Sequence, residues 1–207
     1  ITRVGDAVNR FSVGDAVVGL MAGSIASKSY AASDTISRKP ANLTFEAASA
    51  IPTVFLTAHY AFTRSTQLKP SDTVLIHAGA GGVGQAAIQL AKLAGAKIIA
   101  TAGDEKKRAF LKDQGIDYVF DSRSLSFGDA VKAATEGIGV DVVLNSLSGE
   151  GFIETSLSIC KPGGRFLEIG KRNIWSKEQM FNARPDIEYH VIALDQTAMK
   201  QPQIIRE

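Results

Sequence analysis

From residue 69 onward, short apolar segments alternate with segments of helical character, and this alternation restricts the fold more than any other feature. The apolar segments, which we expect to be strands, lie at residues 73–77, 97–101, 118–120, 141–144, 165–169 and 189–194. Helices are expected between them at residues 84–94, 104–114, 127–135 and 151–160. Continuously apolar strands separated by helices are typical of a parallel sheet covered on both faces. The pattern therefore predicts an α/β fold with a doubly wound parallel sheet, the Rossmann arrangement that binds nucleotides.

The first 40 residues differ from the rest of the chain, because they contain little helical pattern and are interrupted by glycines. Residues 16–20 predict a strand after a turn at residues 13–15, and residues 24–33 predict a second, irregular extended run. This is too little β-structure to close a sheet or barrel alone. We therefore expect an incomplete β segment at the N-terminus.

Residues 41–69 are predicted to be helical. Asn42 or Thr44 can cap a first helix that carries Glu46 in its first turn. Pro52 is expected to begin a second helix, because the missing N–H of proline costs little at the first helical position.

Composition and charge narrow the class of protein. The 207 residues include 23 basic and 21 acidic side chains, and this near balance does not favour a nucleic-acid partner. The sequence has no run of 18 apolar residues, so it predicts no membrane-spanning helix. The N-terminus lacks the pattern of a signal peptide. The chain has a single cysteine, Cys160, and no histidine pair with metal-ligand spacing, so we predict no metal site. Because it begins at Ile1 rather than methionine, we expect a piece of a longer protein.

Residues 77–84 contain the pattern G-x-G-x-x-G at Gly79, Gly81 and Gly84. The pattern alone is weak evidence, but here it directly follows an apolar strand and opens a helix, as a dinucleotide-binding turn does. Glycines let the backbone approach a pyrophosphate, and the helix N-terminus offers N–H groups to it. The alternative is a glycine-rich turn that binds no ligand. A Walker phosphate loop is excluded, because no Gly-Lys-Ser/Thr follows.

The end of the second predicted strand indicates which dinucleotide is bound. An NAD site usually has an acidic residue there, whereas this chain has Thr101 and no carboxylate until Asp104. Cations at residues 106–108 and Arg123 follow, and cations near a neutral strand end favour the 2′-phosphate of NADPH. The alternative is that these cations only solvate a helix face, and the acidic residues Asp104 and Glu105 weaken the argument.

Two further loops follow predicted strands, at residues 145–147 and 170–171. Ligands of open α/β sheets bind outside the carboxyl ends of strands, so both loops are candidates for the nicotinamide end. Lys171 could protonate or polarise a reacting atom there, although the residues alone slightly favour a solvated lysine at a strand end. Asp195 is expected to end the last strand and could orient a lysine; the alternative is an ordinary strand-terminating aspartate.

Five segments occur in an order that resembles a known family: residues 11–20 (FSVGDAVVGL), 53–58 (TVFLTA), 76–84, 142–147 (VVLNSL) and 166–171 (FLEIGK). Together they resemble the enoyl reductase domain of modular polyketide synthases and of the related animal fatty acid synthase. This family is a zinc-free, quinone-oxidoreductase-like branch of the medium-chain dehydrogenase/reductase superfamily. The resemblance extends over roughly residues 1–195, and the last two segments are more specific to it than the glycine loop.

The resemblance implies NADPH-dependent reduction of a trans-2-enoyl thioester, with hydride going to the β-carbon and a proton to the α-carbon. It implies an acyl carrier protein and the neighbouring domains of a synthase as partners, and a cytoplasmic location. It does not decide the oligomeric state. We expect a remnant of a GroES-like substrate domain at residues 1–42 and the NADPH-binding Rossmann domain at residues 43–207.

The resemblance also implies roles for individual residues. The cofactor site would comprise Thr57, Gly79, Gly81, Gly82, Val83, Gly84, Thr101, Lys107, Arg123, Asn145, Leu147 and Gly170. Among these, Lys107 and Arg123 match positions that hold the 2′-phosphate, while Thr57 and the last three match the nicotinamide pocket. The catalytic residues would be Lys171, which matches a lysine thought to donate the proton, and Asp195, which lies near the place of its partner.

The chain departs from the family at three points. Similar domains usually have alanine where Gly79 stands. The family's Asn-Tyr/Phe-Arg-Asp segment is absent, and the sequence ends at Glu207 before a return to the substrate domain. Two other functions therefore stay open, a stand-alone NADPH quinone or enone reductase and a nucleotide-binding fragment with no turnover of its own.

Overall fold

The computed structural model describes residues 1–201 and 203–206 and divides the chain into two compact units. The first unit combines Ile1–Leu56 with the C-terminal segment that begins at Ala193, and the second is Thr57–Ile192. The boundary between these units falls inside a helix, α2 (Pro52–His59), and the expected domain division at residue 42 stays a prediction. Assignment of the N-terminal part to a GroES-like domain stays a prediction.

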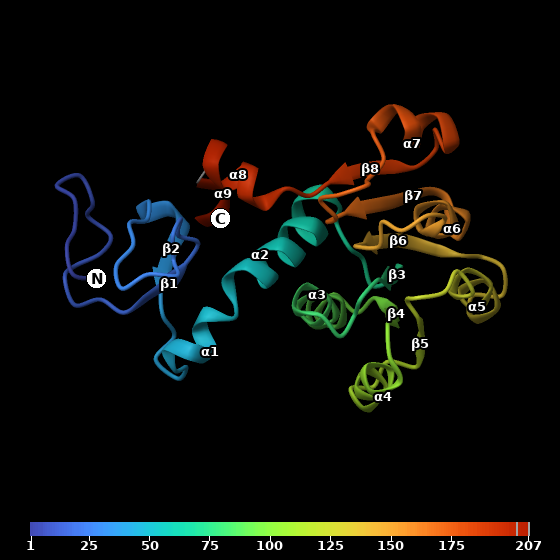
Figure 1. Ribbon diagram of the computed structural model, residues 1–207, viewed down its shortest axis with the longest axis horizontal. Helices are drawn as coiled ribbons and strands as arrows, with labels where there is room; N and C mark the ends of the chain where they lie inside the picture. Colours follow the sequence, from blue (N-terminus) through green and yellow to red (C-terminus); the bar gives the residue numbers. More distant parts are fainter. Residues whose placement is uncertain (202, 207) are drawn as a thin grey trace. The chain divides into compact units, whose positions relative to one another are not determined.

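The second unit contains a six-stranded parallel sheet (Figure 1). Its strands are β3 (Thr73–Ile76), β4 (Lys97–Ala102), β5 (Tyr118–Asp121), β6 (Val140–Asn145), β7 (Cys160–Glu168) and β8 (Glu188–Val191). They are arranged in the order β5-β4-β3-β6-β7-β8, so the direction of winding reverses between β3 and β6. This order confirms the doubly wound sheet, and it places a topological switch point at the end of β3, where such sheets bind ligands.

Helices cover both faces of this sheet, with α3 on one side and α5 and α6 on the other (Figure 1). The helices of this unit are α3 (Gly82–Leu93), α4 (Glu105–Asp113), α5 (Phe127–Ala134), α6 (Phe152–Ser158) and α7 (Lys177–Ala183), and a π-helical segment, Tyr60–Ser65, continues α2. Leu75, Ile99 and Val143 of the central strands are fully buried and belong to one cluster with Phe127 of α5. Burial on both faces explains why these strands are continuously apolar.

The first unit has little regular structure. Two short strands, β1 (Val17–Gly19) and β2 (Ile36–Arg38), pair antiparallel, with a 3-10 turn, η1 (Ser33–Thr35), before β2. The unit also contains α1 (Phe45–Ser49), α8 (Leu194–Lys200) and α9 (Gln203–Arg206). Thr44 rather than Asn42 caps α1, because its hydroxyl accepts a 3.1 Å hydrogen bond from Ala47 N.

The C-terminal end of the sheet differs from the expectation. The last strand was predicted to reach residue 194, but β8 ends at Val191, and α8 begins at Leu194. The amide of Ile192 still donates to Glu168 O at 2.7 Å, and the chain then turns away from the sheet. Asp195 therefore lies in the first turn of α8, and the prediction that it ends a strand is wrong. The apolar run through residue 194 is continuous, so its composition did not reveal the turn.

No helix among the described residues is both long and apolar enough to cross a membrane.

Candidate functional site

The glycine-rich loop links β3 to α3 at the switch point of the sheet. Ala78 has a φ of 50°, in the left-handed region that residues with a Cβ rarely adopt. The amide of Gly79 donates to Thr101 O at 2.8 Å, and the amide of Gly81 donates to Ala78 O at 2.8 Å. These bonds tie the loop to the end of β4 and set the entry into α3.

The reason why glycine is needed differs from one position of this loop to another. A Cβ on Gly84 would lie 2.4 Å from Ala78 O and 2.6 Å from the Cα of Gly79, so any other residue would force the backbone of the loop to move. A Cβ on Gly79 would lie 3.1 Å from the Cβ of Ala100, a tight contact. At Gly81 the one close neighbour is Ala78 O at 3.2 Å, so the backbone there is open to a ligand.

The N-terminus of α3 offers hydrogen-bond donors. Its N-cap is Gly81, and no side chain caps it. The amides of Gly82, Val83 and Gly84 have no acceptor within the helix, because the first turn of any helix lacks them. Together with the partial positive charge of the helix end, these donors and the open backbone fit a pyrophosphate group.

Thr101, at the end of β4, is fully buried. Its hydroxyl accepts a 3.3 Å hydrogen bond from Ala78 N, and its carbonyl accepts the bond from Gly79. The side chain therefore shapes the glycine loop from behind. Direct contact between Thr101 and a cofactor stays a prediction that this burial does not favour.

His77 precedes the loop and is 2% exposed. Its Nδ1 lies 3.0 Å from Thr101 Oγ1, and its Nε2 lies 2.9 Å from Ser156 Oγ. The ring packs edge-on against Phe127, with a centroid distance of 4.9 Å. Burial lowers the pKa of His77 from 6.5 to about 3, so the imidazole is neutral at physiological pH.

Cationic side chains gather where β4 ends. Arg108 donates to Ala102 O at 3.2 Å, and a Cβ on Gly103 would lie 2.9 Å from Arg123 Nε. Lys107 Nζ lies 3.4 Å from Asp104 Oδ2.

Asp104 is one of the two acidic residues near this strand end that weigh against NADPH. Its carboxylate caps α4 by accepting from the amide of Lys107 at 2.9 Å, and this backbone hydrogen bond is the main reason why the pKa of Asp104 is lowered. The carboxylate therefore has a structural role as the cap of α4.

The ends of β6 and β7 are joined by a buried polar cluster. Asn145 is fully buried; its Nδ2 donates to Glu168 Oε2 at 2.6 Å and to Leu147 O at 3.0 Å. In return Leu147 N donates to Asn145 Oδ1 at 3.2 Å. The other carboxylate oxygen of Glu168 accepts from Gly170 N at 2.6 Å. Three predicted nicotinamide-pocket residues, Asn145, Leu147 and Gly170, are thus held together through Glu168.

Glu168 was not among the predicted site residues. It is fully buried, and desolvation raises its pKa, while the hydrogen bonds from Asn145 and Gly170 act in the opposite direction. The available signal was a single carboxylate inside an otherwise apolar strand segment, residues 166–169. Nearby, Ser146 Oγ is buried and, among the described side chains, has no hydrogen-bond partner. A ligand at this strand end would supply one.

The remaining predicted residues occupy separate places. Lys171 is exposed and directly follows Gly170, at the carboxyl end of β7. Thr57 lies on α2 at the start of the second unit, whereas Asp195 lies on α8 in the first unit. The predicted pairing of Lys171 with Asp195 joins the two units and stays a prediction, as does the role of Thr57.

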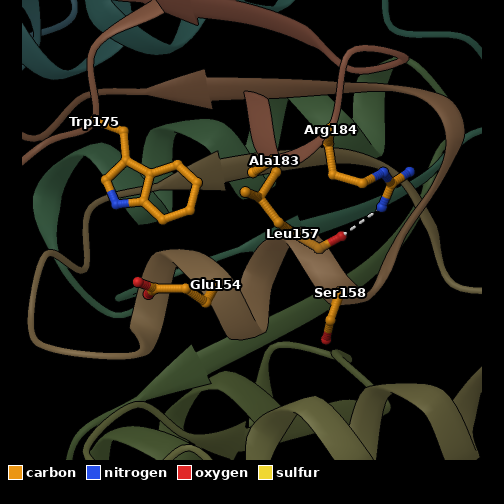
Figure 2. Close-up of a pocket in the computed structure, with 6 residues that line it drawn as sticks. All are labelled: Glu154, Leu157, Ser158, Trp175, Ala183 and Arg184. Carbon is orange, nitrogen blue, oxygen red and sulfur yellow. Dashed lines mark hydrogen bonds between the residues drawn. The ribbon is translucent and has the colours of Figure 1, made fainter. Parts of the chain in front are cut away.

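A hollow of about 210 Å³ lies elsewhere on the second unit (Figure 2). Its lining comes from α6, α7 and the residues on either side of α7: Glu154, Leu157, Ser158, Trp175, Ala183 and Arg184. Arg184 donates to Leu157 O at 3.0 Å and to Cys160 O, at the amino end of β7, at 3.4 Å. Because sheets of this kind bind ligands at the carboxyl ends of their strands, the hollow is not part of the candidate site.

A family model described as zinc-binding dehydrogenase matches residues 82–206. Within the part of the chain that the structure describes, no three His, Cys, Asp or Glu residues are grouped so that they could hold a metal ion. The donor set of the described residues therefore does not fit the zinc that the family's description implies.

Known proteins resemble the whole chain. A mycocerosic acid synthase-like polyketide synthase of Mycobacterium tuberculosis is 40% identical over 210 residues, which cover 100% of this chain and 10% of that protein. The chain thus spans about a tenth of the length of this relative. The crystal structure of CurK enoyl reductase has a TM-score of 0.89 and 41% identity, covering 99% of this chain and 61% of that one. Mycobacterial Rv1454c complexed with NADPH has a TM-score of 0.86 and 27% identity, covering 99% and 65%.

Proposed function

Because the chain belongs to the enoyl reductase domains of polyketide synthases, in the medium-chain dehydrogenase/reductase superfamily, we propose that it binds NADPH and serves the reduction of a trans-2-enoyl thioester carried on an acyl carrier protein. The chain spans a tenth of its curated relative, so we expect neighbouring synthase domains to act with it. The observation that carries the proposal is the glycine loop at the switch point, with open backbone at Gly81 and unpaired amides at the start of α3.

Each part of the cofactor has a place in this proposal. The amides of Gly82 and Val83 bind the pyrophosphate, while Lys107 and Arg123 bind the 2′-phosphate at the end of β4. The nicotinamide lies at the ends of β6 and β7, against the backbone that Glu168 holds in place. The structure of mycobacterial Rv1454c complexed with NADPH supports this choice of cofactor, because it is similar over 99% of this chain.

Bound NADPH supplies a hydride for the β-carbon of the enoyl thioester. The chain's own contribution is to hold the reacting face in position and to deliver a proton to the α-carbon. Lys171 takes the second role, because it follows Gly170, whose amide is anchored by Glu168 at 2.6 Å. The donor set shows no zinc site among the described residues, so no step depends on one.

The activity is tested with an N-acetylcysteamine enoyl thioester, a small mimic of the carrier-bound substrate, by following the loss of reduced-nicotinamide absorbance. We expect turnover of the thioester and none of a benzoquinone. Lys171→Ala should lower kcat by about 10²–10⁴, the usual contribution of a general acid, while NADPH affinity is kept. Lys112→Ala, which removes an exposed lysine from α4, is the control and should change neither quantity.

Two results would contradict the proposed activity. Reduction of the quinone but not of the thioester would indicate a stand-alone quinone or enone reductase. Binding of NADPH without turnover of either compound would indicate a nucleotide-binding fragment.

A further inference from the structure

Three polar side chains are buried behind the glycine loop. They are His77 at the end of β3, Thr101 at the end of β4 and Ser156 in the middle of α6. Thr101 and Ser156 are fully buried, and His77 is 2% exposed. The ring nitrogens of His77 lie 3.0 Å from Thr101 Oγ1 and 2.9 Å from Ser156 Oγ, so the histidine bridges the two hydroxyls.

The two ends of this cluster determine the direction of every hydrogen bond in it. At one end the amide of Ala78 can only donate, so Thr101 Oγ1 accepts from it. At the other end Phe152 O can only accept, so the single proton of Ser156 Oγ goes to that carbonyl, at 2.7 Å.

The tautomer of the imidazole follows from these two constraints. Because the proton of Ser156 is already used, Ser156 Oγ accepts from His77, and Nε2 carries the ring proton. A neutral imidazole has one N–H, so Nδ1 accepts, and the hydroxyl of Thr101 donates to it. The bonds therefore form one directed chain from the amide of Ala78 to the carbonyl of Phe152.

The first member of this chain sits at the pivot of the loop. Ala78 holds a left-handed φ of 50°, which is unfavourable for a residue with a Cβ. Its carbonyl accepts from Gly81 N, the residue that caps α3. Orientation of the Ala78 peptide thus sets the direction in which Gly81 and the first amides of α3 point.

We infer that His77 is a positioning residue for the dinucleotide site, acting as the Nε2–H tautomer through Thr101 to hold Ala78 and thereby the phosphate-binding backbone. The inference rests on the proposed function, because the loop's ligand is the cofactor proposed above. It also links the loop to Ser156 in α6, the helix that follows the loop at residues 145–147. His77 itself touches neither cofactor nor substrate.

One test reads the ring directly. Long-range ¹H–¹⁵N NMR of the 207-residue chain distinguishes the two tautomers, and the His77 signal is assigned by its loss in His77→Gln. We expect a neutral Nε2–H ring without cofactor. A ring protonated on Nδ1 would overturn the inference, because the chain would then run in a direction that its ends do not allow.

A second test measures coupling to the cofactor, with NADPH as the probe in calorimetry. Thr101→Val keeps the shape of the side chain but leaves the amide of Ala78 and Nδ1 of His77 without a partner. We expect NADPH affinity to fall by about tenfold, the worth of one lost hydrogen bond, and Thr101→Ser to restore it to within about twofold.

A core variant separates positioning from general destabilisation. Val131→Ala makes a cavity under α5, in the buried cluster, and should lower stability without changing NADPH affinity. Equal affinities of Thr101→Val and wild type, or an equal loss in Val131→Ala, would overturn the inference. Failure of the wild-type protein to bind NADPH would overturn the proposed function instead. The NMR measurement of the His77 tautomer would then be the test of the hydrogen-bond directions.

Discussion

Replacement of Gly84 by alanine tests the geometry of the glycine loop most severely. The added Cβ would lie 2.4 Å from Ala78 O and 2.7 Å from Gly79 O, and both atoms belong to the backbone, so neither can rotate away. Ordinary contact begins at 3.4 Å, so the loop must move by about 1 Å. Overpacking of this kind costs about 1–3 kcal/mol, and the higher helix propensity of alanine returns at most about 1 kcal/mol.

The shift also misaligns the donors that would bind the cofactor. Hydrogen bonds to a charged group contribute about 1.5–3 kcal/mol each, so misalignment of one donor should weaken NADPH binding by about ten- to a hundredfold. Calorimetry gives the affinity, and thermal unfolding gives the stability. Wild-type affinity together with an unchanged melting temperature for Gly84→Ala would refute the loop geometry.

Two other glycines serve as matched controls. Gly5→Ala places its Cβ in open space, with nothing within 4 Å, and should change neither affinity nor stability. Gly81→Ala meets only Ala78 O at 3.2 Å, so it should keep the fold. It should still lose NADPH, because its Cβ occupies the side from which the pyrophosphate approaches.

Three further perturbations have defined outcomes. The unfolded chain takes up the His77 proton near pH 6.5 and the folded one only near pH 3, so stability should fall by about 2 kcal/mol between pH 7.5 and 5; denaturant titrations should show that His77→Gln lacks this slope. Lys107→Ala should reduce the preference for NADPH over NADH by about 1.5–3 kcal/mol, and an unaltered ratio of the two affinities would remove Lys107 from the site. Glu168→Gln turns an amide N–H₂ toward Asn145 or Gly170 and should lower the free energy of unfolding by about 1–3 kcal/mol. Wild-type stability in urea would contradict the role of the Glu168 carboxylate in holding these two residues.

The central sheet was predictable because its signal is local. Strands buried on both faces are continuously apolar, and the glycine loop stands between one such strand and a helix, so both could be recognised from neighbouring residues. The structure confirms the six parallel strands, although β7 begins at Cys160, five residues before its expected start. Residues 161–164 lie inside this strand, where its register with β6 shifts between Val140 and Val142.

The parts that escaped prediction depend on contacts between distant residues. Glu168 is explained by Asn145, 23 positions away, and Ser156 by His77, 79 positions away. Thr101 is predicted to bind the cofactor, and that contact stays a prediction; the contacts of its hydroxyl with Ala78 and His77 could not be read from the sequence. Local pattern shows where a strand ends and does not show which buried group its last residue will satisfy.

The short elements outside the sheet were missed for another reason. Strand β2 and helices α7, α8 and α9 have three to seven residues each, too few for a periodic pattern to stand out. Helix α7 did carry a start signal, because Ser176 and Gln179 form a capping box, but that signal was not used. Asp195 was misplaced because the apolar residues before it continue past the end of β8.

The most direct test of the account is the affinity of the 207-residue chain for NADPH and NADH, measured by calorimetry at one fixed salt concentration. The account predicts NADPH binding that is stronger than NADH binding by about tenfold or more, since cations at the end of β4 contact the additional phosphate. Binding of neither dinucleotide by a chain with a folded circular dichroism spectrum would contradict the assignment of the glycine loop, and equal binding of both would contradict the role of Lys107 and Arg123.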